Sequence, residues 1–164
     1  MSQPKRRAVL SASKSVYVSP NRGLPLLDEA IEQIELHSVS PRGQWYQGDW
    51  RCESGMCLAG WIDQLAGGEW LSPAGDDFNS DLLVPEPEDD ADELRRAYDG
   101  YDYVPGREGV PAMVRAVRLI GLSWEQYSAT RIWGDIFSGE NTLEMIKGIR
   151  DELAETVYAA NDND

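Results

Sequence analysis

The sequence has 164 residues and a formal net charge of -14, and 41% of its residues are hydrophobic. This length suits one domain rather than two, and the hydrophobic content is too high for a disordered polyelectrolyte. A protein this acidic repels nucleic acid and anionic membranes, so direct binding to either is a poor interpretation. The charge is expected either to attract a protein partner with a basic surface or only to maintain solubility.

Residues 1–23 are expected to form a flexible arm, because they are rich in Ser and end at Pro20-Asn21 and Gly23. The first 22 residues contain Lys5, Arg6, Arg7, Lys14 and Arg22 and no acid. The arm lacks the apolar run of a secretory signal, and no stretch of the sequence has the length of a membrane span. We therefore expect a cytoplasmic location, in the host cell if the protein is encoded by a phage.

Helical spacing of apolar residues predicts a first helix over 25–37, with Pro25 in its first turn. Leu27, Ala30 and Ile34 lie on its apolar stripe. Three acids fall off that stripe and are expected to face solvent: Glu29, Glu32 and Glu35. After a break at Pro41 and Gly43, an aromatic-rich stretch leads into a short apolar helix that ends at Gly67-Gly68.

Residues 72–110 are expected to form an irregular, Pro- and Gly-rich acidic insertion with one short helix near 89–98. The window 76–102 carries eleven acids against Arg95 and Arg96. Such a window is either an ordered acidic lobe or a mobile insertion, and the sequence leaves both open.

The last third is expected to contain three helices. Pro111 opens the first and Gly121 closes it; Ser123 caps the second, which is expected to continue through Phe137 to Gly139. Thr142, or Asn141 before it, caps the third, and residues 161–164 are expected to be a disordered tail. The sequence thus predicts a mainly α fold: a single small helical domain over 24–160, with a flexible basic N-terminal arm and an acidic insertion.

Two cysteines and one histidine are the candidate residues for catalytic or metal-binding chemistry. Cys52, Cys57 and His37 are too few for a closed zinc site, and the glycines follow no phosphate-binding pattern. An atypical enzyme centred on these three side chains is one hypothesis, with a Cys thiolate as nucleophile. A buried, structural Cys pair is favoured over it, so we expect no metal, no cofactor and no catalytic residue.

Partner binding is instead assigned to acids and to tryptophans. Six Trp and seven Tyr stand against two Phe, and such amphipathic rings either close a core or anchor an interface. Trp61 and Trp133 fall on apolar helix faces and are expected in the core. The candidate partner-binding residues are Glu88, Asp89, Asp90, Asp92, Trp45, Trp50 and Trp70.

The segment 50–61 reads Trp-x-Cys-x-Ser-x-x-Cys-Leu-Ala-Gly-Trp. It resembles a motif of uncharacterised small proteins of tailed phages and bacteria, and the similarity extends to residues 120–122 and 136–142, within a span of about 26–155. Glu53 stands where that pattern prefers Gly, Ser54 stands where it has Thr, and 72–110 is an enlarged insertion. The resemblance implies a phage or mobile-element context and no particular activity.

These observations favour a non-enzymatic acidic accessory protein that binds a host or phage protein, in its sharper form as a DNA-mimic inhibitor. Two alternatives remain: a structural component of a larger phage assembly that docks through the arm, and the atypical enzyme described above.

Overall fold

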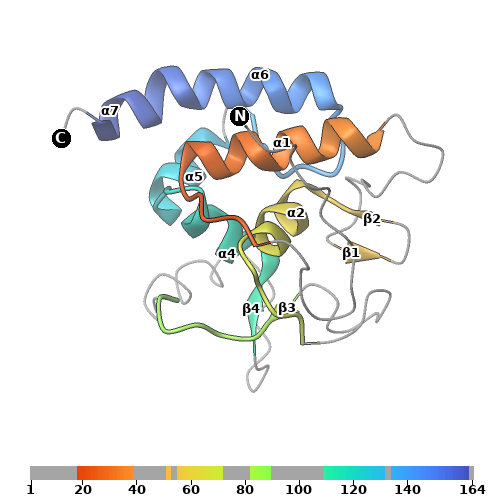
Figure 1. The fold of residues 1–164 in the computed structure, drawn as a ribbon. Coiled ribbons are helices and arrows are strands. Elements are labelled where there is room, and N and C mark those ends of the chain that lie inside the picture. Colours follow the sequence, from red (N-terminus) through yellow and green to blue (C-terminus); the bar gives the residue numbers. More distant parts are fainter. Residues whose placement is uncertain are drawn as a thin grey trace, which may run out of the picture.

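The computed structural model describes residues 18–38, 51–52, 55–71, 82–89, 109–131 and 134–162. Their architecture is a mainly helical small domain, as the sequence predicts (Figure 1). The helices are α1 (Leu24–Ser38), α2 (Leu58–Leu65), α4 (Ala112–Leu119), α5 (Trp124–Thr130), α6 (Leu143–Leu153), the π-helical turn η1 (Ala154–Tyr158) and α7 (Ala159–Asp162).

Helix α2 is the centre of the domain and packs against α1 on one side and α4 on the other. All of its residues are buried, and Trp61 is completely inaccessible, which confirms the expected core position of that ring. The N-cap of α2 is Cys57, and the helix is followed by Gly67 with a φ of 81°. Positive φ favours glycine, so Gly67 ends α2 where the sequence predicts.

Helix α1 confirms the predicted apolar stripe, since Leu27, Ala30 and Ile34 are all buried. The expectation that Glu29 faces solvent is wrong: its side chain is only 6% exposed and accepts hydrogen bonds from Ser19 and Asn21. A single helical face does not predict this burial, because the segment that covers Glu29 comes from outside the helix.

Residues 18–23 are packed against the domain, so the predicted boundary of the arm is wrong. Ser19 is buried and its backbone N–H donates to the Leu65 carbonyl at 2.6 Å. The Gly23 N–H donates to the Leu119 carbonyl at 2.8 Å. These bonds tie the segment before α1 to the ends of α2 and α4. Residues 1–17 of the arm lie outside the described residues.

Two short antiparallel strand pairs, which the sequence did not predict, accompany the helices. β1 (Arg51–Cys52) pairs with β2 (Gly55–Met56), immediately before α2. β3 (Leu82–Leu83) pairs with β4 (Val110–Pro111), and Trp70 forms an isolated bridge with Leu83. The bridge and the second pair together connect Leu83, inside the acidic insertion, to residues at both of its ends. The helix expected near 89–98 lies outside the described residues except for Asp89, which is not helical.

The C-terminal helices begin where their caps predict. The Ser123 hydroxyl accepts from the Gln126 N–H in a capping box, and the Thr142 hydroxyl accepts from the Met145 N–H. The predicted continuation of the Ser123 helix through Phe137 is wrong, because α5 ends at Thr130. The Thr130 hydroxyl donates to the Tyr127 carbonyl, and the Asn141 amide donates to the carbonyls of Asp135 and Ile136. These side-chain bonds satisfy the backbone without a helix.

The C-terminal helix contains one π-helical turn. Leu153 and Tyr158 are both buried and are five residues apart, which is one π turn, whereas an α-helical turn would align residues four apart. The Tyr158 hydroxyl donates to the Ile120 carbonyl at 2.6 Å. The helix continues through Asp162, so the predicted disordered tail begins later than Asn161, and the last two residues lie outside the described part.

Candidate functional site

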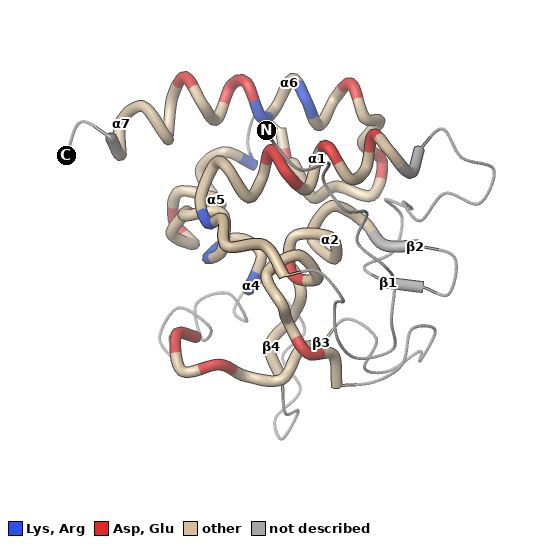
Figure 2. The backbone as a smooth tube through the Cα atoms, viewed as in Figure 1, with Lys and Arg blue, Asp and Glu red and all other residues tan. Residues whose placement is uncertain are grey.

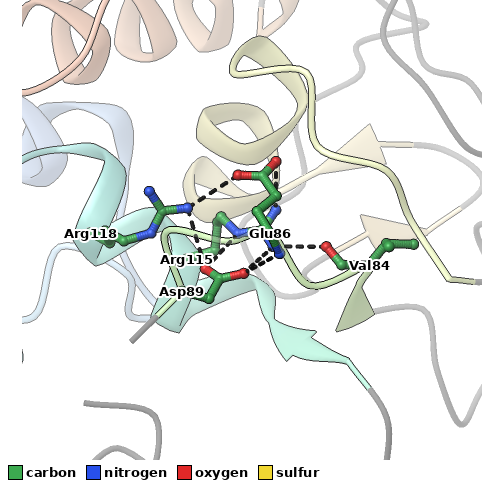
Figure 3. A network of polar contacts seen from close by, with 5 residues as sticks. All are labelled: Val84, Glu86, Asp89, Arg115 and Arg118. Carbon is green, nitrogen blue, oxygen red and sulfur yellow. Dashed lines mark hydrogen bonds and ion pairs between the residues drawn. The ribbon is translucent and has the colours of Figure 1, made fainter. Parts of the chain in front are cut away.

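A buried arginine of α4 organises the polar contacts of residues 84–89, the part of the acidic insertion that follows β3 (Figure 3). The Arg115 side chain is 1% exposed and donates from Nε to Asp89 Oδ1 at 3.1 Å and from Nη2 to Asp89 Oδ2 at 2.6 Å. Nη2 also donates to the Val84 carbonyl at 2.8 Å. This paired geometry fixes the planar guanidinium, so the segment after β3 is held on α4.

Two further charges complete the surface side of this cluster. Glu86 lies 3.3 Å from Arg115 Nη1 and 3.3 Å from Arg118 Nη2, and Arg118 Nη2 is 3.2 Å from Asp89. The Asp89 carboxylate also accepts from the Glu86 N–H at 2.8 Å. Burial by itself would raise the pKa of Asp89, but the hydrogen bonds from Arg115 and the Glu86 N–H outweigh it and lower that pKa.

A fifth charged group, Asp63, lies in the middle of α2 and is fully buried. Neither carboxyl oxygen has a hydrogen-bond partner among the described residues. Desolvation by burial raises the pKa of Asp63 well above its usual value, although the charges of Arg115 and Arg118 oppose the shift. Two arginines already balance Glu86 and Asp89, so a negative charge on Asp63 would have no further cation in this cluster to compensate it. The sequence analysis did not single out Asp63. The feature that could have identified it is the position of an acid inside a short apolar helix.

The structure separates the predicted partner-binding acids. Glu88 is exposed, as a partner-binding residue must be, whereas the Asp89 side chain is 5% exposed and bound by Arg115. Placing Asp89 among solvated surface acids was therefore wrong, because the sequence does not show an arginine twenty-six residues away. Asp90 and Asp92 lie outside the described residues.

The predicted tryptophan surface receives no support from Trp70. Its side chain is 3% exposed, and its Nε1 donates to Gln64 Oε1 at 2.7 Å. The expectation that Trp70 anchors a partner is wrong, since the ring belongs to the core and its polar edge is satisfied inside it. Trp45, Trp50 and Trp133 lie outside the described residues.

The cysteines and the histidine are only partly described. Cys57 is buried, at 1% exposed. The backbone of Cys52 lies in β1 and that of His37 in α1, but their side chains are outside the described part. Within the described residues, no three His, Cys, Asp or Glu side chains are grouped as metal ligands.

The basic side chains that the structure describes are bound to partners, and the side chain of Arg51 lies outside the described part. In addition to the buried arginines, Arg131 pairs with Asp135, Lys147 pairs with Glu35 and Arg150 pairs with Asp28. Arg22 donates to backbone carbonyls. The cations of α6 thus neutralise acids of α1, where the two helices lie side by side (Figure 2).

A set of carboxylates remains without an ion pair in the described segments, and all of its members are exposed: Glu69, Glu88, Glu140, Glu144, Glu152 and Glu155. Three of these lie on the C-terminal helix of Figure 2. Asp151 joins them, since its side chain is 71% exposed although it contacts Arg150. Glu144 and Asp151 are seven residues apart and share a helix face, and Glu155 follows one turn later. We call Glu144, Asp151 and Glu155 the acidic stripe.

Comparison of the chain with protein-family models, curated proteins and solved structures gave no match. Among the described helices, none combines the length and the apolar character needed to cross a membrane.

Proposed function

We propose that this protein is a non-enzymatic acidic binding protein that recognises a basic surface on a host or phage protein. The observation that carries the proposal is the acidic stripe together with the pairing of the cations around it. Lys147 and Arg150 are bound to acids of α1, and Arg150 also contacts Asp151, so Glu144 and Glu155 are the members of the stripe whose charge no cation of α6 offsets.

The acidic stripe supports recognition by charge because its carboxylates are exposed and are carried on α6 and on the π-helical turn that continues it. Exposed charges of one sign raise the rate of encounter with an oppositely charged partner, and their effect declines as salt screens them. In the sharper form of the proposal, these carboxylates replace phosphates and occupy the nucleic-acid site of the partner as a DNA mimic.

The test is affinity capture from a host lysate with the wild-type chain and with the triple variant Glu144→Gln, Asp151→Asn, Glu155→Gln as bait. We expect the wild type to retain a basic protein that the triple variant loses. The control is Glu69→Gln with Glu140→Gln, which removes two exposed carboxylates from other segments.

The captured protein is then purified and its association with each variant is measured at low and high salt. We expect the triple variant to lower the association rate more than it raises the dissociation rate. Competition by duplex DNA would support the DNA mimic. A partner that binds the wild type and the triple variant equally would refute recognition through the acidic stripe, and co-purification with a phage particle through residues 1–17 would favour the structural alternative.

A further inference from the structure

An open groove of about 460 Å³ lies beside the acidic stripe, between α6 and the loop that precedes it. It is lined by Gly134, Asn141, Met145, Gly148, Ile149 and Glu152. The four α6 residues of this lining are spaced at i, i+3, i+4 and i+7, so they form one continuous strip of the helix surface. The groove therefore follows a helix face instead of crossing its end.

Gly148 is the unexplained residue of this groove. Glycine in a helix interior is unfavourable compared with alanine, so its presence there calls for a packing reason. A Cβ at Gly148 would meet no atom within 4 Å, whereas a Cβ at Gly134 would lie 3.1 Å from Ile149 Cγ1. Close packing of the loop on α6 thus accounts for Gly134, but no contact in the described structure accounts for Gly148. Close approach of a second molecule would account for it.

The rest of the groove surface has the character of a docking site. Met145 is 49% exposed and is one of the few large apolar side chains exposed in the described segments. Methionine adapts its shape to a partner surface and is frequent where helices bind. Ile149 beside it is half-buried and packs against the core, so the floor of the groove is apolar and is supported from below.

The charges around the groove determine the kind of occupant. Glu152 lines it, and the acidic stripe continues along the same helix. The two cations of α6 are paired with Glu35 and Asp28 of α1, and Arg150 also contacts Asp151 of the stripe. An occupant must therefore bring an apolar strip for Met145 and Ile149 and positive charges for the carboxylates. A helix with one apolar and one basic face meets both requirements, and a glycine at the crossing point lets two helices approach closely.

We propose that this groove docks a basic amphipathic helix of the protein partner, with the helix passing over Gly148. This inference rests on the proposed function, because it specifies where and by which element the basic partner binds. The acidic stripe supplies attraction over a distance, and the groove supplies the apolar contact that decides the orientation of the bound helix.

The test uses two fluorescently labelled synthetic peptides of identical Leu and Lys composition and the full chain. One peptide places Leu on a single helical face, and the other has the same residues in an order without an apolar face. In fluorescence anisotropy at moderate salt, the amphipathic peptide should bind at least about tenfold more tightly than its isomer. The variant Gly148→Leu projects a side chain into the groove from a position where a Cβ meets no atom within 4 Å. It should abolish this preference while its melting temperature stays at or above that of the wild type.

The triple variant of the acidic stripe distinguishes this inference from the proposed function. It should weaken binding of both peptides, because both carry the same positive charge, whereas Gly148→Leu should weaken only the amphipathic one. Equal binding of the two peptides to the wild type would refute docking of a helix in the groove. An unchanged preference of Gly148→Leu for the amphipathic peptide would refute it too. Neither result would contradict recognition by the acidic stripe. A wild-type dimer that Gly148→Leu converts to a monomer would also overturn it, because the occupant would then be a second copy of the chain.

Discussion

Arg115 and Asp89 are twenty-six residues apart in the chain, and they form a paired interaction in which Nε and Nη2 donate to the two carboxylate oxygens at 3.1 and 2.6 Å. Both side chains are nearly inaccessible, at 1% and 5% exposed. The pair therefore acts within a desolvated cluster, where loss of one partner leaves the other charge poorly compensated.

The first prediction concerns this pair. Asp89→Asn should lower the free energy of unfolding by about 2 kcal/mol, somewhat less than the usual cost of breaking a buried ion pair because Glu86 stays beside Arg115. The control is the neighbouring exposed acid, because Glu88→Gln should change the free energy of unfolding by less than about 0.5 kcal/mol. Urea unfolding measures both. Equal effects of the two substitutions would contradict a structural role for Asp89.

Asp89 also predicts how stability responds to acid. Its pKa is lowered in the folded state, so it contributes stability above its unfolded pKa, and that contribution is lost as the pH falls through the folded pKa. Unfolding curves of the wild type should therefore show a fall in stability at acid pH that is smaller in Asp89→Asn. A wild-type and a variant profile that decline in parallel would argue against this linkage.

The second prediction concerns Asp63, whose pKa is shifted in the opposite direction to that of Asp89. Burial raises its pKa in the folded state, so its contribution is fully present below the unfolded pKa and is lost as the pH rises through the folded pKa. Asp63→Asn keeps the size and shape of the side chain and removes its ionisable carboxyl group. The variant should gain stability relative to the wild type as the pH rises above about 4, up to a constant difference. Parallel pH profiles from urea unfolding would show that Asp63 does not titrate in this way.

The third prediction tests the packing of the segment before α1. Ser19→Ala should lower the free energy of unfolding by about 1–2 kcal/mol, because it removes a donor from the buried Glu29 carboxylate. A double-mutant cycle with Glu29→Gln should give a coupling energy of at least about 0.5 kcal/mol. Deletion of residues 1–17 is still expected to leave the melting temperature nearly unchanged, whereas deletion of 1–22 should lower it. Equal melting temperatures of the two truncated chains would refute this boundary.

The fourth prediction concerns the π turn. Tyr158→Phe keeps the ring and removes the donor to the Ile120 carbonyl, so it should cost about 1 kcal/mol. Chemical denaturation measures the loss, and circular dichroism should show unchanged helix content. A variant as stable as the wild type would mean that the five-residue spacing is maintained by apolar packing alone.

The fifth prediction is a gain of stability. Gly148→Ala should raise the free energy of unfolding by about 0.5–1 kcal/mol, because alanine is the better helix former and its Cβ meets no neighbour. Thermal unfolding followed by circular dichroism is sufficient to detect the change. A loss of stability would indicate a contact at Gly148 within the domain and would remove the reason for placing a partner there.

The sequence by itself determined the helices and their starts. The apolar spacing of residues 25–37 predicts α1, and the hydroxyls of Ser123 and Thr142 predict the starts of α5 and α6, because helical periodicity and capping involve residues only a few positions apart. The overall acidity follows from composition alone.

Only the tertiary structure decided which polar residues are buried. Asp89 and Glu29 each have the local pattern of an exposed residue, and each is bound by a residue from another segment of the chain. Trp70 is buried as well, with its Nε1 donating to Gln64 of α2. The non-helical turn at Asp135 and Ile136 is likewise held by a side chain further along the chain, since the Asn141 amide donates to both carbonyls. Local periodicity describes a helix or a loop by itself, whereas the burial of a charge depends on long-range partners that compensate its desolvation, and the fold brings those partners together.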